Sequence, residues 1–239
     1  MKKILILVMS SQQPMYKNLY MVSQETWNSI PHPRTRTRFY FGNPVQPNTP
    51  DTSYFPYDDN LANLGRITLG AYEQALQEPD WDFIARVNAS CYVHKRLLAD
   101  YVDTKPDHGV LCGLIADSGL GFPYLWGGGQ YIISRDVVEK LVAGKDKWNH
   151  RMMEDGAVSK LALDLEIPVD GKGRACSINA VEDGYLCIAY RDGEQGGFRF
   201  KTYEEFAEQN DQFFIRVKHD PNRAEDLVRM RSLFQTLTP

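Results

Sequence analysis

Residues 2–9, Lys-Lys-Ile-Leu-Ile-Leu-Val-Met, are followed at once by the polar residues 10–13, Ser-Ser-Gln-Gln. A short apolar run of this kind is typical of a parallel strand that is buried on both faces. It also imitates a signal peptide, but it is short and no small-residue cleavage site follows it. We therefore expect residues 3–9 to form a buried first strand of a cytoplasmic protein without a membrane anchor.

Strand patterns and helix patterns alternate along the rest of the chain, which indicates one α/β domain. Strands are predicted at residues 3–9, 37–41, 81–87, 109–115, 131–133, 185–190 and 213–218, and helices at 15–27, 61–77, 94–101, from 134, 154–163, 203–209 and 223–237. Four prolines between residues 44 and 56 predict an exposed loop without regular structure over residues 42–60. The order of elements predicts a doubly wound, mostly parallel sheet flanked by helices, with ligands bound beyond the carboxyl ends of its strands.

The charge and cysteine content of the chain indicate which kinds of ligand it can bind. The 239 residues carry a formal net charge of −4, so bulk charge will not attract nucleic acid. The densest basic cluster is Arg34, Arg36 and Arg38, whose alternation with threonine predicts the solvent side of a strand. The four cysteines are scattered, which indicates buried free thiols in a reducing compartment rather than a zinc or redox motif.

Residues 80–93 form a buried strand that ends in short polar side chains, Asn88-Ala89-Ser90. Such a strand end can present oxygen atoms to a ligand. Asparagine and serine are also common where a strand becomes a turn, which explains the pattern without a ligand.

Residues 122–135 contain three consecutive glycines, residues 127–129. Glycines let a backbone approach a ligand closely, and Tyr124 and Trp126 offer flat faces on which a sugar can stack. A structural turn flanked by core aromatic residues explains the pattern as well. The motifs of phosphate-binding loops and dinucleotide sites do not occur.

Charged residues suggest chemistry at two further places. Glu154 and Asp155 begin a predicted helix, and the helix dipole favours acids at that end. An acid at the start of a helix that faces a cleft is also well placed to act as a general base. Arg216, Lys218 and His219, with Arg223 close behind, can meet anionic groups or remain solvated.

Together these segments resemble the Fringe and β-1,3-galactosyltransferase group of glycosyltransferases. The similar stretches are residues 9–27, 58–76 with an Asn-Leu-Thr helix, 81–93, 126–134 with Gly-Gly-x-Tyr-x-x-Ser, and 154–155 in place of Glu-Asp-Val. They occur in the same order as in that group and cover roughly the first two-thirds of the chain.

The resemblance implies a single GT-A domain over residues 1–239, with a nucleotide-sugar-binding half at 1–115 and an acceptor-binding half at 116–239. It implies a nucleotide-sugar donor, usually a UDP-sugar, and inversion at the anomeric carbon. Carried over by position, Asp155 is the general base and Glu154 supports it. The remaining positions implied are Ser10, Asn63, Arg66, Arg86, Asn88, Ser90, Gly128 and Gly129 for the donor, and Tyr124 and Trp126 for the acceptor.

One departure concerns the metal. Acidic residues of the family hold Mn²⁺ or Mg²⁺ at the position where this chain has Asn88-Ala89-Ser90, and both ions prefer carboxylate oxygen. Three alternatives are open. A metal binds through the diphosphate with Asn88, Ser90 or His219 as ligands; cationic groups such as Arg86, Lys95, Lys218 or His219 replace it; or the protein has no activity.

Two functions follow from these alternatives. The first is an inverting glycosyltransferase, and the second is a catalytically degenerate protein that binds a nucleotide-sugar or glycan. Relatives that modify secreted glycoproteins carry a signal anchor, and we see none here. The expected acceptor is accordingly a glycan, such as a bacterial surface-glycan precursor, or a hydroxymethylated base in phage DNA.

Overall fold

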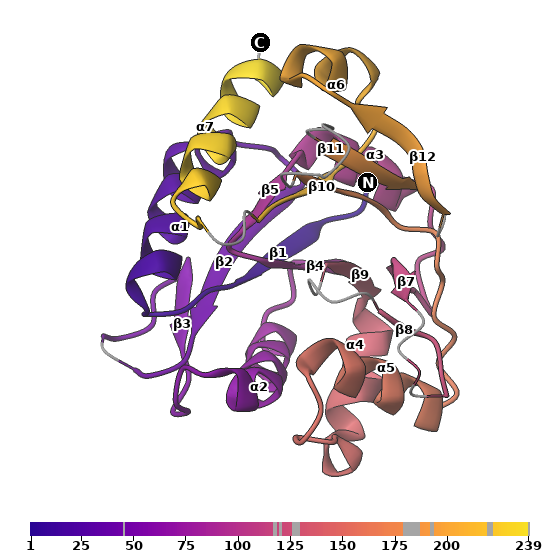
Figure 1. Cartoon of the computed structure of the whole chain (residues 1–239). Coiled ribbons are helices and arrows are strands. Elements are labelled where there is room, and N and C mark those ends of the chain that lie inside the picture. Colours follow the sequence, from indigo (N-terminus) through magenta and orange to yellow (C-terminus); the bar gives the residue numbers. More distant parts are fainter. Residues whose placement is uncertain are drawn as a thin grey trace.

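The structure is a computed structural model that describes residues 1–44, 46–116, 119, 121–125, 130–178, 187–191, 194–218 and 222–238. Its main sheet has six strands in the order β3-β2-β1-β4-β9-β6 (Figure 1). The bounds are β1 Ile4–Met9, β2 Thr35–Phe41, β3 Thr52–Tyr54, β4 Phe83–Asn88, β6 Leu111–Gly113 and β9 Tyr131–Ser134. The first four strands run parallel, and β9 runs antiparallel to β4 and β6. The predicted α/β fold with a mostly parallel, helix-flanked sheet is confirmed.

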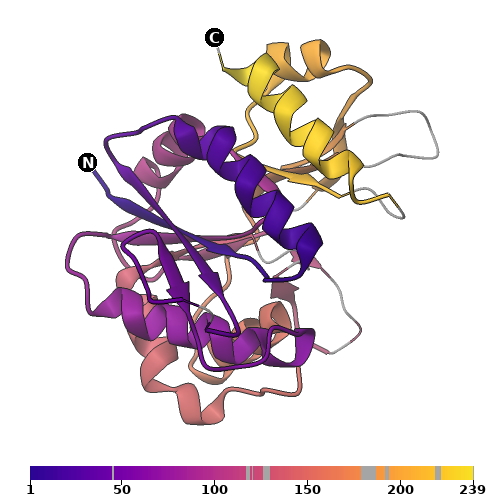
Figure 2. The same ribbon diagram turned by 90° about the vertical axis from the view of Figure 1, so that its left-hand side faces the viewer.

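Helices cover both faces of this sheet, which explains the unbroken apolar run of β1. Its even-numbered residues Ile4, Ile6 and Val8 belong to one core, and Leu5 and Leu7 belong to the other. The first core includes residues of α1 (Pro14–Glu25), α3 (Lys95–Asp103) and α7 (Glu225–Leu237), and the second includes residues of α2 (Leu64–Leu76), α4 (Arg135–Ala143) and α5 (Glu154–Asp164). Figure 2 shows α7 lying alongside α1.

A second sheet lies beside the first, and the sequence analysis did not anticipate it. Its five strands run in the order β12-β11-β10-β13-β5, with bounds β5 Cys91–Val93, β10 Arg174–Ile178, β11 Cys187–Arg191, β12 Glu194–Phe200 and β13 Phe214–Val217. The strand β5 was merged with its predecessor because only two residues separate them. The pair β7 (Ile115–Ala116) and β8 (Tyr124–Leu125), the short helix α6 (Tyr203–Gln209) and the 3₁₀ turns η1 (Trp27–Ser29), η2 (Leu61–Asn63) and η3 (Lys145–Lys147) complete the fold.

The expectation that residues 42–60 lack regular structure was wrong at one point. The strand β3 pairs in parallel with the edge of β2, and Phe39 donates a backbone hydrogen bond to the carbonyl of Asp51. Pro50 and Pro56 flank this strand instead of interrupting it. The free edge of β2 therefore imposes strand structure on a segment whose composition predicts a loop.

The arginines of β2 also differ from expectation. Arg36 is on the solvent side as predicted, but Arg38 is only 5% exposed. Both arginines form ion pairs with the carboxylate of Glu78, and Arg38 donates to the carbonyl of Pro50 as well. Its burial is compatible with charge because its guanidinium is paired and hydrogen-bonded.

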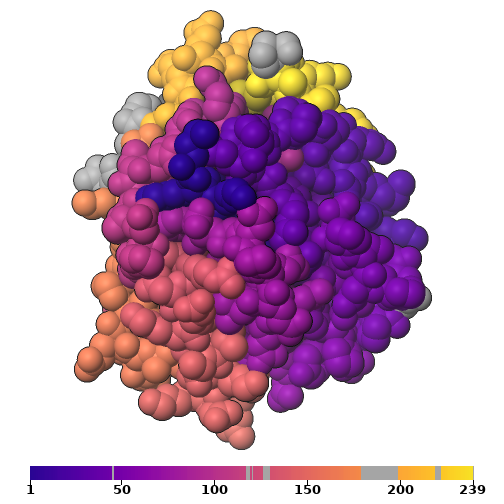
Figure 3. Space-filling model, turned by 180° about the vertical axis from the view of Figure 1, so that it is seen from behind, coloured from indigo at the N-terminus to yellow at the C-terminus, as the bar shows by residue number. Residues whose placement is uncertain are grey.

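Three cysteines, Cys91, Cys112 and Cys176, are buried free thiols, as predicted. Figure 3 shows the N-terminal residues at the surface on the face opposite to that of Figure 1. In the described ranges, every helix is too short or too polar to cross a bilayer.

Candidate functional site

A cavity of about 590 Å³ opens at the carboxyl ends of β1 and β4. This is the edge at which doubly wound sheets bind their ligands. Its walls come from both sheets, from the first turn of α5 and from the segment before α2. The lining residues are Met9, Ser10, Ser11, Gln13, Tyr16, Asp59, Asn60, Leu61, Leu64, Arg86, Asn88, Ser90, Met153, Glu154, Asp155, Arg216, Lys218 and Arg223.

The two sheets meet at the Asn88-Ala89-Ser90 triplet. Asn88 is in register with Met9 at the end of β1, and Ala89 donates to the carbonyl of Met9 at 2.8 Å. Two residues later the chain enters the second sheet as β5, and Val217 of β13 donates to the carbonyl of Ser90 at 2.8 Å. The triplet therefore places β13 beside the cavity, and its residues Asn88 and Ser90 line the cavity.

A buried ion pair crosses the base of the cavity. The guanidinium of Arg86 lies 2.8 Å from Oε2 of Glu154, and their side chains are 1% and 4% exposed. The hydroxyl of Tyr131 donates to Oε1 of Glu154 at 2.6 Å, and the hydroxyl of Tyr72 lies 2.5 Å from that of Tyr131. Arg86 also donates to Oδ1 of Asn88 at 2.7 Å. This network fixes Glu154 in the core of the protein.

Electrostatics keep this pair charged. Burial raises the pKa of Glu154, while the guanidinium of Arg86 and the hydrogen bond from Tyr131 oppose that rise. Burial disfavours the charged form of Arg86 too, but the carboxylate of Glu154 and the neighbouring tyrosines Tyr40, Tyr131 and Tyr72 together outweigh it, and the pKa of Arg86 is raised. Because arginine does not lose its proton in proteins, Glu154 is a structural counter-ion and is not placed to exchange a proton.

Asp155 has a different environment although it is the next residue. It lies in the first turn of α5, is 7% exposed and lines the cavity. Its Oδ1 accepts from the N–H of Gly156 at 2.9 Å, and the hydroxyl of Ser159 donates to its backbone carbonyl at 2.7 Å. In the parts of the chain that the structure describes, Asp155 forms no ion pair. Its carboxylate thus lies at the cavity wall, held at the start of α5.

The residues at the triplet do not fit a divalent metal. Oδ1 of Asn88 accepts a hydrogen bond from the cationic Arg86, which uses one of its two lone pairs and places a positive charge beside the oxygen. The neighbouring carboxylate of Glu154 is committed to the same guanidinium. Among the described residues, no group of three or more His, Cys, Asp or Glu side chains could hold a metal ion.

Six of the residues expected at the site line the cavity together: Ser10, Arg86, Asn88, Ser90, Glu154 and Asp155. Trp126, Gly128, Gly129 and His219 lie outside the described residues.

Four other candidates make contacts elsewhere and do not line this cavity. The amide of Asn63 donates to the carbonyl of Asp58, and Arg66 lies 6.0 Å from the ring centroid of Tyr57. Tyr124 is in β8, opposite Ala116. Lys95, one of the cations considered as a metal substitute, donates to the carbonyl of Ile30 at 2.8 Å and is excluded from that role.

Two residues that line the cavity were not among the site residues expected from the sequence. Asp59 comes from the proline-rich segment 42–60, and its carboxylate accepts from the backbone N–H of Gln12. Tyr16 lies on α1, and the guanidinium of Arg223 lies 6.0 Å from its ring centroid. The proline-rich loop was a usable signal for Asp59, whereas nothing in the spacing of α1 marks Tyr16.

Of the comparisons with known proteins, the one with solved structures bears on the fold. No protein-family model matches the chain, and neither does the sequence of any curated protein. Among solved structures, it is similar to one described as a glycosyltransferase involved in the glycosylation of the major capsid of PBCV-1. The TM-score is 0.55 at 15% sequence identity, over 96% of this chain and 99% of the other. The likeness thus spans the whole chain and shows that this chain shares the fold of a glycosyltransferase.

Proposed function

We propose that the protein is a glycosyltransferase that moves a sugar from a nucleotide-sugar to an acceptor hydroxyl, with Asp155 as general base. One observation carries the proposal. Asp155 lines the same cavity as the cations Arg216 and Lys218, while its neighbour Glu154 forms the buried pair with Arg86. A carboxylate and cations in one cavity suit a reaction that removes a proton from an acceptor and releases a nucleoside diphosphate.

The proposed step is a single displacement. The acceptor oxygen attacks the anomeric carbon and forms the new glycosidic bond, while the bond from that carbon to the diphosphate oxygen breaks. The acceptor proton passes to the carboxylate of Asp155, and the electron pair of the broken bond leaves with the nucleoside diphosphate.

Inversion follows from the number of available carboxylates. Three described carboxylates line the cavity: Asp59, Glu154 and Asp155. Glu154 is bound to Arg86, and Asp59 belongs to the segment before η2 and accepts from Gln12. This leaves Asp155 as a base and no second carboxylate beside it to act as a nucleophile, which favours one displacement over two.

The donor we propose is a UDP-sugar, and the acceptor we propose is a glycan. A DNA acceptor calls for cations that contact phosphates around the cavity. Arg34, Arg36 and Arg38, the densest basic cluster, instead form ion pairs with Asp100, Asp103 and Glu78. The exposed apolar side chains of Leu61 and Met153 lie at the cavity and offer contacts for the carbon-bearing face of a sugar.

A thermal-shift screen of nucleotide-sugars tests the proposal. A donor that binds the folded state raises the melting temperature by mass action, so one nucleotide-sugar should stabilise the protein more than its free sugar does. Incubation of that donor with candidate glycans should then release nucleoside diphosphate. Binding without any transfer would favour the degenerate binding protein, and absence of binding to every nucleotide-sugar would overturn the proposed class.

A further inference from the structure

We infer that the cavity binds the donor's diphosphate without a divalent cation, and that Arg216, Lys218 and Arg223 supply the positive charge that a metal would otherwise bring. This inference rests on the proposed function and concerns the same cavity. On this inference the reaction needs no metal, and the three cationic side chains stabilise the leaving diphosphate.

The strand β13 delivers two of these cations. Residues that are two apart on a strand point to the same side, so Arg216 and Lys218 share a side that Val217 does not. Val217 is fully buried in the core, whereas Arg216 and Lys218 are half-buried and line the cavity. The antiparallel pairing of Arg216 with Cys91 places this strand directly after the Asn88-Ala89-Ser90 triplet. Both cations are therefore next to the position where a metal would be expected.

The third cation comes from the turn before α7. Nε of Arg223 lies 2.6 Å from Oδ2 of Asp226, whose side chain is fully buried. The same guanidinium lies 6.0 Å from the ring centroid of Tyr16, another lining residue. Asp226 and Tyr16 thus hold Arg223 in place at the cavity wall, and a preorganised guanidinium fits phosphate oxygens well.

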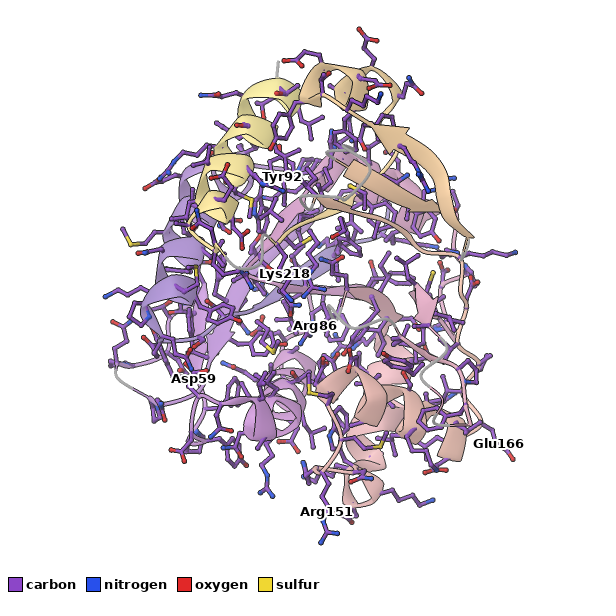
Figure 4. The ribbon with its side chains drawn as sticks, viewed as in Figure 1. Asp59, Arg86, Tyr92, Arg151, Glu166 and Lys218 are labelled. Carbon is purple, nitrogen blue, oxygen red and sulfur yellow. The ribbon has the colours of Figure 1, made fainter. Side chains whose placement is uncertain are left out.

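Repulsion argues against a metal in the same place. Figure 4 shows Arg86 and Lys218 in the middle of the molecule, where the two sheets meet, with Asp59 to one side. A dication at Asn88 would lie close to the guanidinium that already donates to Oδ1 of Asn88 at 2.7 Å. Like charges this close repel each other, and the repulsion is stronger in a site that is shielded from water. Cationic side chains that attract the diphosphate directly avoid that repulsion.

Titration calorimetry in EDTA and in Mn²⁺ tests the inference. The probes are uridine, UMP, UDP and inorganic pyrophosphate, which separates the contribution of the phosphates from that of the base. We expect UDP to bind in EDTA, more tightly than UMP and uridine, and Mn²⁺ to change its Kd by less than about threefold. Binding should weaken as NaCl is raised, because the attraction is between charges.

Variants identify the residues. Lys218→Met and Arg216→Met each remove one positive charge while keeping much of the aliphatic stem, and each should raise the Kd for UDP about tenfold or more. Lys147→Met is the matched control: it makes the same change of net charge at an exposed residue of η3 that does not line the cavity. Arg223 is left intact, because removing it would take away the guanidinium that pairs with the fully buried carboxylate of Asp226. The melting temperature of each free variant verifies that it folds.

Each outcome decides between the ideas. Binding of UDP or pyrophosphate in EDTA, weakened by the β13 variants but not by Lys147→Met, supports the inference. Binding that appears only with Mn²⁺ overturns it but leaves the proposed function standing. Metal-free binding that the β13 variants do not affect overturns the assignment of these cations. Absence of binding by all four probes, with and without Mn²⁺, overturns both the inference and the UDP donor.

Discussion

Glu154 and Asp155 are adjacent acids with opposite environments. Residues next to each other on a helix point about 100° apart, so one of the two can enter the core while the other faces the cavity. Glu154 meets Arg86 and Tyr131 in the core, and Asp155 faces the cavity. The sequence predicted both acids as site residues, and we propose that Glu154 holds the helix end in place while Asp155 acts on the bound molecule.

The role of Asp155 leads to the first prediction. Asp155→Asn keeps the size of the side chain and its hydrogen bond from Gly156 but removes the basic oxygen. Transfer should fall about 10²–10⁴-fold in kcat while the Kd for the donor stays within about twofold. Single-turnover assays and calorimetry on the same preparation measure the two quantities, and Ser11→Ala serves as a control at the cavity edge. Undiminished transfer by Asp155→Asn would remove this residue from the mechanism.

The buried pair leads to the second prediction. Glu154→Gln removes the carboxylate that pairs with the buried guanidinium of Arg86, which should lower the free energy of unfolding by about 3–5 kcal/mol. The double variant Arg86→Met, Glu154→Leu removes both charges and should recover a large part of that loss. Urea unfolding of the unchanged protein, Arg86→Met, Glu154→Leu and the double variant gives the coupling free energy. Equal losses for the single and the double variant would show that packing, rather than charge, holds this position.

At the scale of elements, two helical glycines sit in contrasting surroundings. A Cβ atom on Gly65 of α2 would lie 2.8 Å from Nε1 of Trp148, a side chain that is only 4% exposed. A Cβ atom on Gly156 of α5 would lie 3.3 Å from the terminal methyl of Met152, which can move aside. The close approach of α2 to Trp148 therefore depends on Gly65, whereas α5 tolerates a side chain at Gly156.

The third prediction compares these two glycines. Gly65→Ala should destabilise the protein by about 1–3 kcal/mol, because the indole cannot retreat from a packed core. Gly156→Ala should be neutral or stabilising by up to about 1 kcal/mol, because alanine is the better helix former. Thermal unfolding of both variants measures the difference. A stabilised Gly65→Ala variant would show that Trp148 has room to move.

The same scale shows how far sequence reasoning reaches. The strand β1 was predictable because burial on both faces leaves a continuous apolar run. The strand β3 was not, because its structure comes from pairing with the edge of β2 and not from its own residues. Six of the residues that line the cavity could be predicted from the order of the sequence motifs. Tyr16 and Asp59 lie at the cavity because of how the folded chain packs.

At the scale of the whole molecule, the chain passes directly from the first sheet to the second at residues 88–90, and the cavity lies at that crossing. The first sheet supplies the strand ends and the Arg86–Glu154 pair, and the second supplies the cations of β13. The cations were predictable from the sequence, but the second sheet that positions them was not. Pairings between segments far apart in the sequence leave no local pattern from which they can be read.

A fourth prediction concerns the stability of the whole fold against pH. Burial lowers the pKa of Lys95 from its ordinary 10.5 to about 8, where its ammonium donates to the carbonyls of Asn28 and Ile30. Between pH 8 and 10.5 the unfolded chain binds the Lys95 proton more fully than the folded chain does. The contribution of Lys95 to the free energy of unfolding therefore rises with pH across that window and is constant below it.

The comparison with Lys95→Met isolates this effect from the titration of other groups. The free energy of unfolding of the unchanged protein minus that of Lys95→Met should increase as the pH is raised from 8 to 10.5. Denaturant unfolding at several pH values measures it. A difference that stays level throughout would show that Lys95 titrates as it does in the unfolded chain.

The central claim is that the nucleotide-sugar donor binds where the two sheets meet, and a crystal structure with UDP tests it most directly. The account predicts density for the diphosphate beside Ser10 and Asn88, with phosphate oxygens within ion-pair distance of Arg216 and Lys218 and with Asp155 across the cavity. Crystals grown with Mn²⁺ should show no metal between Asn88 and the diphosphate. A nucleotide bound on another face, or a metal ion bridging Asn88 and the phosphates, would contradict the account.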